Sequence, residues 1–128
     1  MRLLLSAPSS GTRLVRLIGA LALLAMCAST VQAMSIRELR KLEKSDPKQG
    51  ANYMRYYLVG TMEGALEAHD QAVRSGATAS ICLNGRRLSP DMAEGLYRTE
   101  LKRNADLYEA DMPVQLVVTN ALANVYPC

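Results

Sequence analysis

The chain has 128 residues, which is enough for one domain and leaves little room for a second. Its formal net charge of +3 comes from 15 Lys and Arg against 12 Asp and Glu. Three of the arginines lie in the first 33 residues, which hold no acidic residue, so the rest of the chain carries twelve charges of each sign. A neutral domain lacks the basic surface that phosphate backbones require, and this excludes nucleic acid as an expected partner.

The N-terminal segment predicts export. Arg13 and Arg16 precede an apolar run over residues 17–26, and Ala33 ends a stretch with small residues at the positions that a signal peptidase reads. An uncleaved membrane anchor is the alternative, but the uncharged stretch 17–31 is shorter than the roughly 20 residues needed to span a bilayer. We therefore expect residues 1–33 to be a cleaved signal peptide.

A lipoprotein is a second alternative, with Cys27 as the lipidated residue. Met26 before it is bulky, whereas the lipid-attachment signal requires a small residue there. We expect residues 34–128 to be a periplasmic domain with no stable membrane anchor after cleavage. Such a domain keeps two cysteines, Cys82 and Cys128.

An isolated cysteine pair in an oxidising compartment usually forms a disulfide. The alternative is two buried free thiols, which would be the default in a cytosolic protein. Closing a loop of some 45 residues would stabilise the domain by roughly 4 kcal/mol in the chain-entropy model. Because a domain this small has a limited core, we expect a Cys82–Cys128 bond to matter for folding.

The first two predicted helices are marked by their caps. Ser35 and Glu38 have the spacing of a capping box, which predicts a helix that stops near residue 45. Asp46-Pro47 then predicts a long second helix, with proline in its first turn. That helix ends at Ser75-Gly76, since glycine suits a helix C-terminus.

The long helix has one apolar face and one charged face. The apolar face carries Met54, Leu58, Thr61, Ala65, Ala68 and Ala72, flanked by Met62 and His69. Gly60 and Gly64 lie on a border of this stripe, and glycine costs about 1 kcal/mol inside a helix. We therefore expect a neighbouring helix to approach closely at these two glycines.

The last two helices follow a connection over residues 76–88. Ser89-Pro90 predicts the third helix, which has apolar residues at i, i+4 and i+8 and ends near residues 104–106. The fourth spans residues 112–126 and holds a helical apolar period for three turns, although residues 116–119 alone could form a strand. The predicted fold is a small all-α, four-helix domain with one disulfide.

Signals for catalysis are weak. His69 is the single histidine and flanks an apolar stripe, so a packed histidine is the favoured interpretation. Glu63 and Glu67 share a helix face with Asp70 and Arg74, which favours a solvated charged face over an acid–base pair. The sequence has no phosphate-binding glycine loop and no Cys-x-x-Cys motif. We expect no enzyme activity, no catalytic residues, no metal and no cofactor.

Protein binding is the remaining expectation. The connection carries Asn84, Arg86 and Arg87, and Cys82 would hold one end of it. Adjacent arginines on a tethered loop can form forked hydrogen bonds to the carboxylates of a partner. We predict that these three residues contact a protein partner; a solvated loop with no partner is the alternative.

Three segments resemble the Rap/Tai family, the periplasmic amidase immunity proteins of type VI secretion. They are residues 57–66 (YLVGTMEGAL), 81–83 (ICL) and 121–128 (ALANVYPC), within a resemblance that covers roughly residues 51–128. The sequence departs from the family pattern at Leu58, Thr61 and Asn84, where members commonly have cysteine, tyrosine and proline.

The resemblance implies an all-helical periplasmic domain, often a homodimer, that occludes the active site of a cell-wall amidase effector. Immunity surfaces diverge with the toxins they fit, so the resemblance names no particular toxin. A small helical stress or chaperone-like periplasmic protein with no toxin partner is the alternative function.

Overall fold

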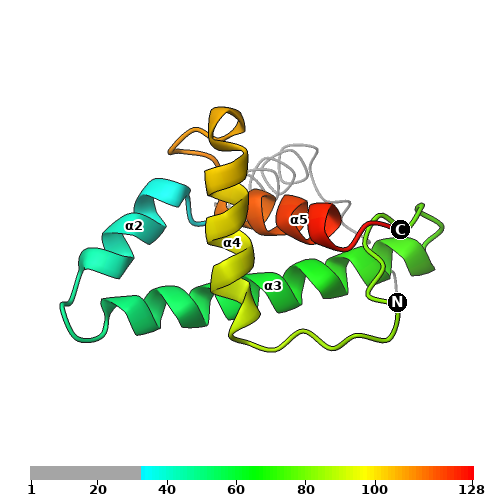
Figure 1. Cartoon of the computed structure of the whole chain (residues 1–128), viewed down its shortest axis with the longest axis horizontal. Coiled ribbons are helices and arrows are strands. Elements are labelled where there is room, and N and C mark those ends of the chain that lie inside the picture. The colour runs from blue at the N-terminus through cyan, green and yellow to red at the C-terminus, as the bar shows by residue number, and fades with distance from the viewer. Residues whose placement is uncertain (1–32) are drawn as a thin grey trace, which may run out of the picture. The chain divides into compact units, whose positions relative to one another are not determined.

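The computed structural model describes residues 33–128 (Figure 1). They form α2 (Ile36–Lys44), α3 (Gly50–Arg74), α4 (Met92–Arg103) and α5 (Val114–Val125), with a 3-10 turn, η1 (Ala105–Leu107), after α4. This part of the chain contains no β-strand, so the predicted all-α, four-helix domain is confirmed. The predicted signal peptide, including Cys27, lies outside the described residues apart from Ala33.

The predicted capping box starts α2. The Ser35 hydroxyl accepts a hydrogen bond from the Glu38 amide at 3.2 Å, and the Glu38 carboxylate accepts one from the Ser35 amide at 2.7 Å. The backbone hydrogen bond from Ser35, followed by that from its hydroxyl, lowers the pKa of Glu38. The cap therefore satisfies two amides that the helix leaves without partners.

The start of α2 is joined to the start of α5 through backbone atoms. The amides of Ile36 and Arg37 donate to the carbonyls of Met112 at 3.0 Å and Ala110 at 2.7 Å. In return, the Val114 amide donates to the Met34 carbonyl at 2.9 Å. These bonds use first-turn amides of both helices, and so fix the position of α2 beside the chain that leads into α5.

Helix α3 begins three residues later than a start at Pro47 would place it. The Asp46 carboxylate accepts from the amides of Lys48 and Gln49, at 2.7 and 2.8 Å, and residues 47–49 form a turn. A Cβ at Gly50 would overlap the Glu43 carbonyl at the end of α2. Glycine is required at this position because the two helices approach one another through backbone atoms.

The C-terminus of α3 is as predicted. Gly76 has φ +99°, the left-handed region that favours glycine. Its amide donates to the Val73 carbonyl, and the Ala77 amide donates to the Ala72 carbonyl, both at 3.0 Å. This pair of bonds is a Schellman motif, which satisfies carbonyls at the end of the helix.

The predicted close approach at Gly60 and Gly64 is wrong. A Cβ at either glycine would meet no atom within 4 Å, and both residues are exposed. The buried stripe of α3 runs through Met54, Leu58, Met62 and Ala65 instead, so the two glycines face away from the other helices. Further along, Ala68 and Ala72 are exposed, and the apolar face predicted for the whole helix is buried only in its first part.

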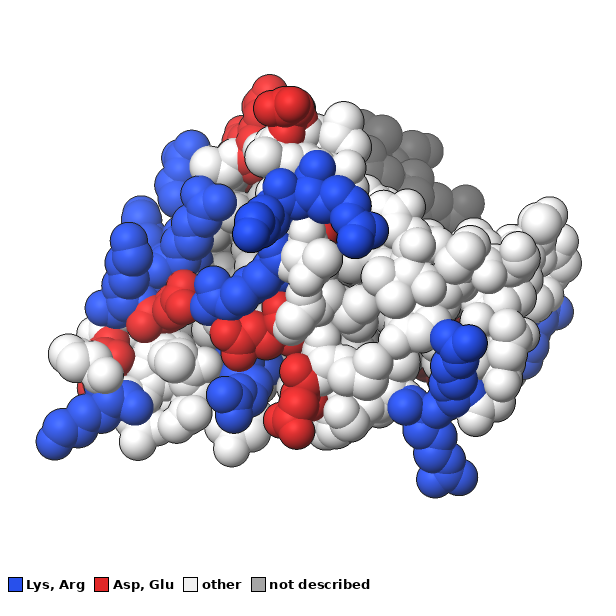
Figure 2. Space-filling model, in the orientation of Figure 1, with Lys and Arg blue, Asp and Glu red and all other residues white. Residues whose placement is uncertain are grey.

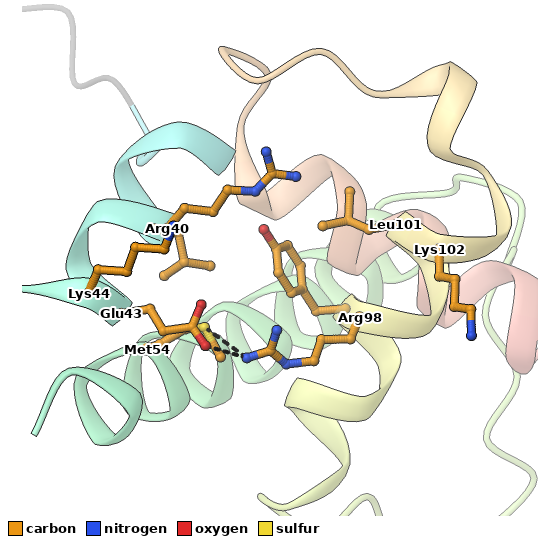
Figure 3. Close-up of a pocket in the computed structure, with 9 residues that line it drawn as sticks. Arg40, Glu43, Lys44, Met54, Arg98, Leu101 and Lys102 are labelled. Carbon is orange, nitrogen blue, oxygen red and sulfur yellow. Dashed lines mark hydrogen bonds and ion pairs between the residues drawn. The ribbon is translucent and has the colours of Figure 1, made fainter. Parts of the chain in front are cut away.

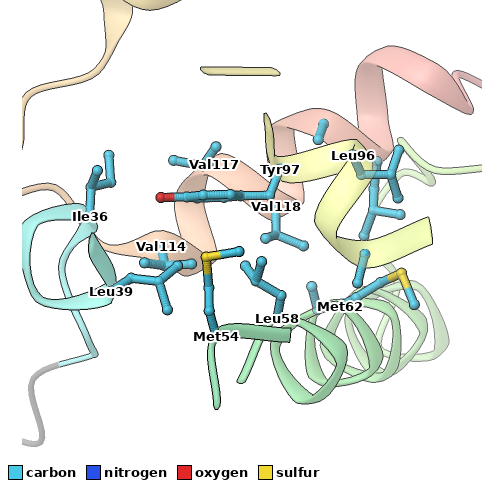
Figure 4. Packing of buried hydrophobic residues seen from close by; sticks show 14 of the residues in the cluster. Ile36, Leu39, Met54, Leu58, Met62, Leu96, Tyr97, Val114, Val117 and Val118 are labelled. Carbon is cyan, nitrogen blue, oxygen red and sulfur yellow. The ribbon is translucent and has the colours of Figure 1, made fainter. Parts of the chain in front are cut away.

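The core lies where α2, α4 and α5 meet the first part of α3 (Figure 4). Its largest fully buried side chains are Ile36, Leu39, Met54, Leu58, Met62, Val114, Val117, Val118 and Leu122. The valines confirm the helical period predicted for α5, since all of them except Val125 are buried. The ring of Tyr97 crosses the middle of this core and carries its hydroxyl toward α2 (Figure 4).

Candidate functional site

The connection between α3 and α4 is bonded to the end of the chain. The predicted Cys82–Cys128 disulfide is present, with Cα atoms 4.8 Å apart. The Cys82 amide also donates to the Tyr126 carbonyl at 2.8 Å, and Ile81 forms an isolated β-bridge with Pro127. One covalent bond and one short backbone pairing therefore fix the chain immediately before the predicted binding residues.

Residues 83–86 form a tight turn. Asn84 and Gly85 both have positive φ, at 52° and 77°, and the Arg86 amide donates to the Leu83 carbonyl at 3.0 Å. Two central residues with positive φ define a type I′ turn, for which Asn-Gly is the preferred sequence. The sequence had shown a polar connection; the structure shows that its backbone has a defined conformation.

The turn exposes the three residues predicted to contact a partner. Asn84, Arg86 and Arg87 are all solvent-exposed, and neither arginine forms an ion pair within residues 33–128. Basic side chains project from the surface near this connecting segment (Figure 2). Two guanidinium groups without carboxylate partners are available to bind anionic groups on another molecule.

His69 supports the connection from α3. Its Nε2 lies 3.1 Å from the Ser80 amide nitrogen and 3.2 Å from that of Ile81, and both amides donate to it. Its Nδ1 lies 3.3 Å from the Asp70 carboxylate. An acceptor at Nε2 requires the neutral ring with its proton on Nδ1. The histidine thus has a structural role, as the sequence favoured.

The charged face of α3 is solvated, as expected. Glu63, Glu67, Asp70 and Arg74 are all exposed. Asp70 precedes Arg74 by four residues, a spacing that favours an ion pair. The Arg74 guanidinium instead binds Glu67 at 2.8 Å, and Asp70 lies beside His69. Exposed pairs of this kind contribute little to stability, and the face has no enclosed pair of carboxylates.

A buried carboxylate between α4 and α5 was missed by the sequence reasoning. Glu100 is 4% exposed and accepts hydrogen bonds from Tyr108 Oη at 2.7 Å, Asn104 Nδ2 at 2.9 Å and Asn124 Nδ2 at 3.1 Å. Asn120 donates in turn to the Tyr108 hydroxyl at 3.0 Å. Glu100 follows Tyr97 by three residues and so lies on the same face of α4, and the next helix has asparagines at positions 120 and 124. This pattern could have indicated a buried carboxylate with amide donors.

The network determines the charge state of Glu100. Desolvation raises its pKa, but the hydrogen bonds from Tyr108, Asn124 and Asn104 outweigh that effect, so the pKa lies below its ordinary value. The carboxylate is therefore ionised at neutral pH. It joins α4 to α5 through donors rather than through a cation.

Residues 33–128 contain no group of three or more His, Cys, Asp or Glu side chains placed to hold a metal ion. No helix in that range is long and apolar enough to cross a membrane.

Comparisons of the chain with family models, with curated proteins and with solved structures found no match.

Proposed function

We propose that this chain is a periplasmic, non-enzymatic binding protein of the immunity type. It inhibits a peptidoglycan amidase effector of type VI secretion by occluding the active site of that enzyme. The observation that carries the proposal is the exposed turn at Asn84 and Gly85, which presents Arg86 and Arg87 without internal carboxylate partners. No other connection in residues 33–128 combines a defined turn, a disulfide anchor and two adjacent arginines.

The anchoring of this turn favours tight binding. A segment that is already ordered loses less conformational entropy when it meets a partner, and more of the contact energy remains as affinity. The disulfide fixes Cys82 at one side of the turn, and His69 holds the amides just before it. Such a preformed projection suits entry into a concave active site without prior folding.

The family resemblance adds the nature of the partner to this proposal. An all-helical domain closed by a bond between the Cys-Leu turn and the C-terminal cysteine is what the resemblance implies, and the chain has both features. Inhibition of an amidase by occlusion, and formation of a homodimer, are carried over from the resemblance as proposals.

The test is calorimetric titration against the cognate cell-wall hydrolase, once the gene neighbourhood identifies one. We expect Arg86→Ala and Arg87→Ala each to weaken binding by about 2–5 kcal/mol if the guanidinium pairs with a buried carboxylate. Arg37→Ala is the matched control, because Arg37 is exposed, has no ion pair in residues 33–128 and lies on α2. Wild-type binding by both loop variants would contradict the proposed surface.

A chaperone-like function is the second candidate, and the buried Glu100 network is the observation that favours it. Acid protonation of Glu100 would remove a charged acceptor that joins α4 to α5 and so loosen the apolar core. A dye that fluoresces on apolar surface, measured from neutral pH to pH 3, separates the candidates. Strong dye binding in acid together with suppression of client aggregation would favour the chaperone; one stoichiometric partner would favour immunity.

A further inference from the structure

A cleft of about 440 Å³ opens between α2, α3 and α4 (Figure 3). Its volume falls within the range of small-molecule sites in proteins. The apolar part of its lining is Leu39, Met54 and Leu101, and the polar part is Arg40, Glu43, Lys44, Tyr97, Arg98 and Lys102. No residue of the connection between α3 and α4 contributes to it.

The charged side chains that line the cleft are four cations and one carboxylate. Arg98 donates to Glu43 at 2.6 Å and to Glu94 at 2.8 Å, so this cation has two carboxylate partners. Arg40 and Lys44 have no ion pair within residues 33–128. Both extend from α2 toward the space that faces α4, whereas the Lys102 ammonium group points away from it (Figure 3). An anion in the cleft would relieve this excess positive charge.

The Tyr97 hydroxyl gives a second, independent indication of a ligand. Tyr97 is 3% exposed, and its hydroxyl has no hydrogen-bond partner among residues 33–128, although buried polar groups almost always have one. Burial raises the pKa of this phenol, with Arg40 and Arg98 acting in the opposite direction. The group is therefore protonated at neutral pH and is a hydrogen-bond donor without an acceptor.

We propose that the cleft binds an organic anion: a carboxylate or phosphate head group carried on a short apolar chain. The head group accepts the hydrogen bond that Tyr97 has to donate and is paired by Arg40 and Lys44. The apolar chain lies against Leu39, Met54 and Leu101. Neither a purely apolar ligand nor a fully hydrated inorganic anion would use both parts of this lining.

This site does not depend on the proposed immunity function. The cleft involves α2, α3 and α4, and the partner-binding turn involves residues 83–88, so each can be altered without touching the other. Loss of ligand binding in a cleft variant should leave hydrolase binding intact, and the reverse holds for Arg86→Ala.

The probes are octanoate and octyl phosphate, with octanol as the neutral control of equal chain length. Each is titrated calorimetrically into the purified, disulfide-bonded protein. We expect an anionic probe to bind with a Kd of about 1 mM or tighter, and octanol to bind at least about tenfold more weakly. The tighter of the two anions identifies the head group.

Three variants locate the binding. Tyr97→Phe removes only the hydroxyl and should weaken anion binding about thirtyfold, the usual value of one hydrogen bond to a charged group. Because that hydroxyl is unpartnered, the same variant should melt no lower than wild type, which separates lost binding from lost folding. Arg40→Gln should weaken binding about tenfold, as expected for a charge-assisted contact. Lys41→Gln is the control, because Lys41 is exposed on α2 and does not line the cleft, and it should bind like wild type.

Several results would overturn the proposal. One is the absence of binding by both anions up to about 10 mM, a concentration at which a millimolar site would be nearly saturated. Another is octanol binding as tightly as the anions, which would make the site purely apolar. Binding that survives both Tyr97→Phe and Arg40→Gln would place the ligand elsewhere on the protein.

Discussion

The two ends of α3 are held in place by different interactions. Residues 50–65 bury Met54, Leu58 and Met62 beneath the other helices. Residues 66–74 leave Ala68, Ala72 and Val73 exposed, and the connection that follows is fixed by the Cys82–Cys128 bond and by His69. The first region is stabilised mainly by exclusion of water from apolar groups. The second is stabilised by one covalent bond, a few polar contacts and a smaller apolar contact through Leu66 and Ile81.

This difference separates the packed core from the segment that carries the proposed binding turn. The packed region has no reason to change with redox conditions, whereas the region that carries the proposed binding turn depends on an oxidised cysteine pair. A small domain can thus present an exposed turn with few buried side chains of its own: Ile81 is buried, and Leu83 and Leu88 pack partly against the core.

Removal of the disulfide should have the largest effect. The bond joins residues 46 positions apart, and the chain-entropy model assigns about 4 kcal/mol to a loop of that length. Cys82→Ser should lower the free energy of unfolding by that amount in chemical denaturation. Cys128→Ser is the matched control and should cost the same, with no further loss in the double variant.

Hydrogen exchange gives the local form of the same test. In Cys82→Ser, we expect the amides of residues 80–86 to exchange by local opening, with a smaller opening free energy than the amides of residues 54–65, which exchange through global unfolding. The same opening free energy for both sets would contradict the division between the packed core and the connection. Two free thiols in the purified, unreduced protein would contradict the bond itself.

The packed end is tested by Leu58→Ala. Leu58 is fully buried, and truncation of a buried leucine costs about 3 kcal/mol because it removes apolar contacts and leaves a cavity. Val73→Ala is the matched control on the exposed end, where we expect a change within about 0.5 kcal/mol. Denaturation midpoints measure both, and equal losses would show that the far end of α3 is packed as well.

The Glu100 network should give the next largest effect and a dependence on pH. Glu100→Gln replaces an ionised acceptor of three donors, and a hydrogen bond to a charged group contributes about 2 kcal/mol. The folded pKa lies below the ordinary value of 4.5, so this stabilisation is present above pH 4.5 and is lost as the pH falls through the folded pKa.

The measurement for Glu100 is the free energy of unfolding of both proteins from pH 7 to pH 3. The difference between wild type and Glu100→Gln should be constant near neutrality and should shrink below pH 4.5. Glu63→Gln is the control, since Glu63 is exposed and has no hydrogen-bond partner among the described side chains. A difference that does not change with pH would show that the pKa of Glu100 is the same in the folded and the unfolded protein, and a difference that changes only above pH 4.5 would show that the folded pKa is raised.

A smaller, local effect is expected from His69→Phe. The aromatic ring is kept, but the amides of Ser80 and Ile81 lose their acceptor, which should cost about 1 kcal/mol. Hydrogen exchange at those two amides should accelerate before any global change is seen. Asp70→Asn is the control, because it leaves Nε2 free to accept; an equal effect would assign the contact to the carboxylate.

Local signals in the sequence predicted much of this architecture. The capping box at Ser35, the glycine stop at Gly76 and the valine period of α5 each act within a few residues, so a sequence pattern can reveal them. The disulfide followed from cysteine number and the expected compartment. The turn at Asn84 was placed in a connection, but its backbone conformation was not foreseen.

Interactions between distant segments could not be predicted in this way. Glu100 lies three residues after Tyr97 on the buried face of α4, but its donor Asn124 reaches it only through packing of α5 on α4. The cleft beside Arg40 likewise depends on three helices. For glycine, sequence position alone cannot distinguish a close contact from an open surface, and the structure places the close contact at Gly50 rather than at Gly64.

The smallest expected effect tests that placement of the close contact. Gly64 is exposed and a Cβ there meets no atom within 4 Å, so Gly64→Ala should raise the free energy of unfolding by about 0.5–1 kcal/mol through helix propensity alone. Gly50→Ala is the opposing control, since its Cβ would overlap the Glu43 carbonyl and should destabilise the protein. Thermal and chemical denaturation of the two variants should therefore shift in opposite directions. A loss of stability in Gly64→Ala would mean that another surface, such as a second copy of the chain, packs against this face of α3.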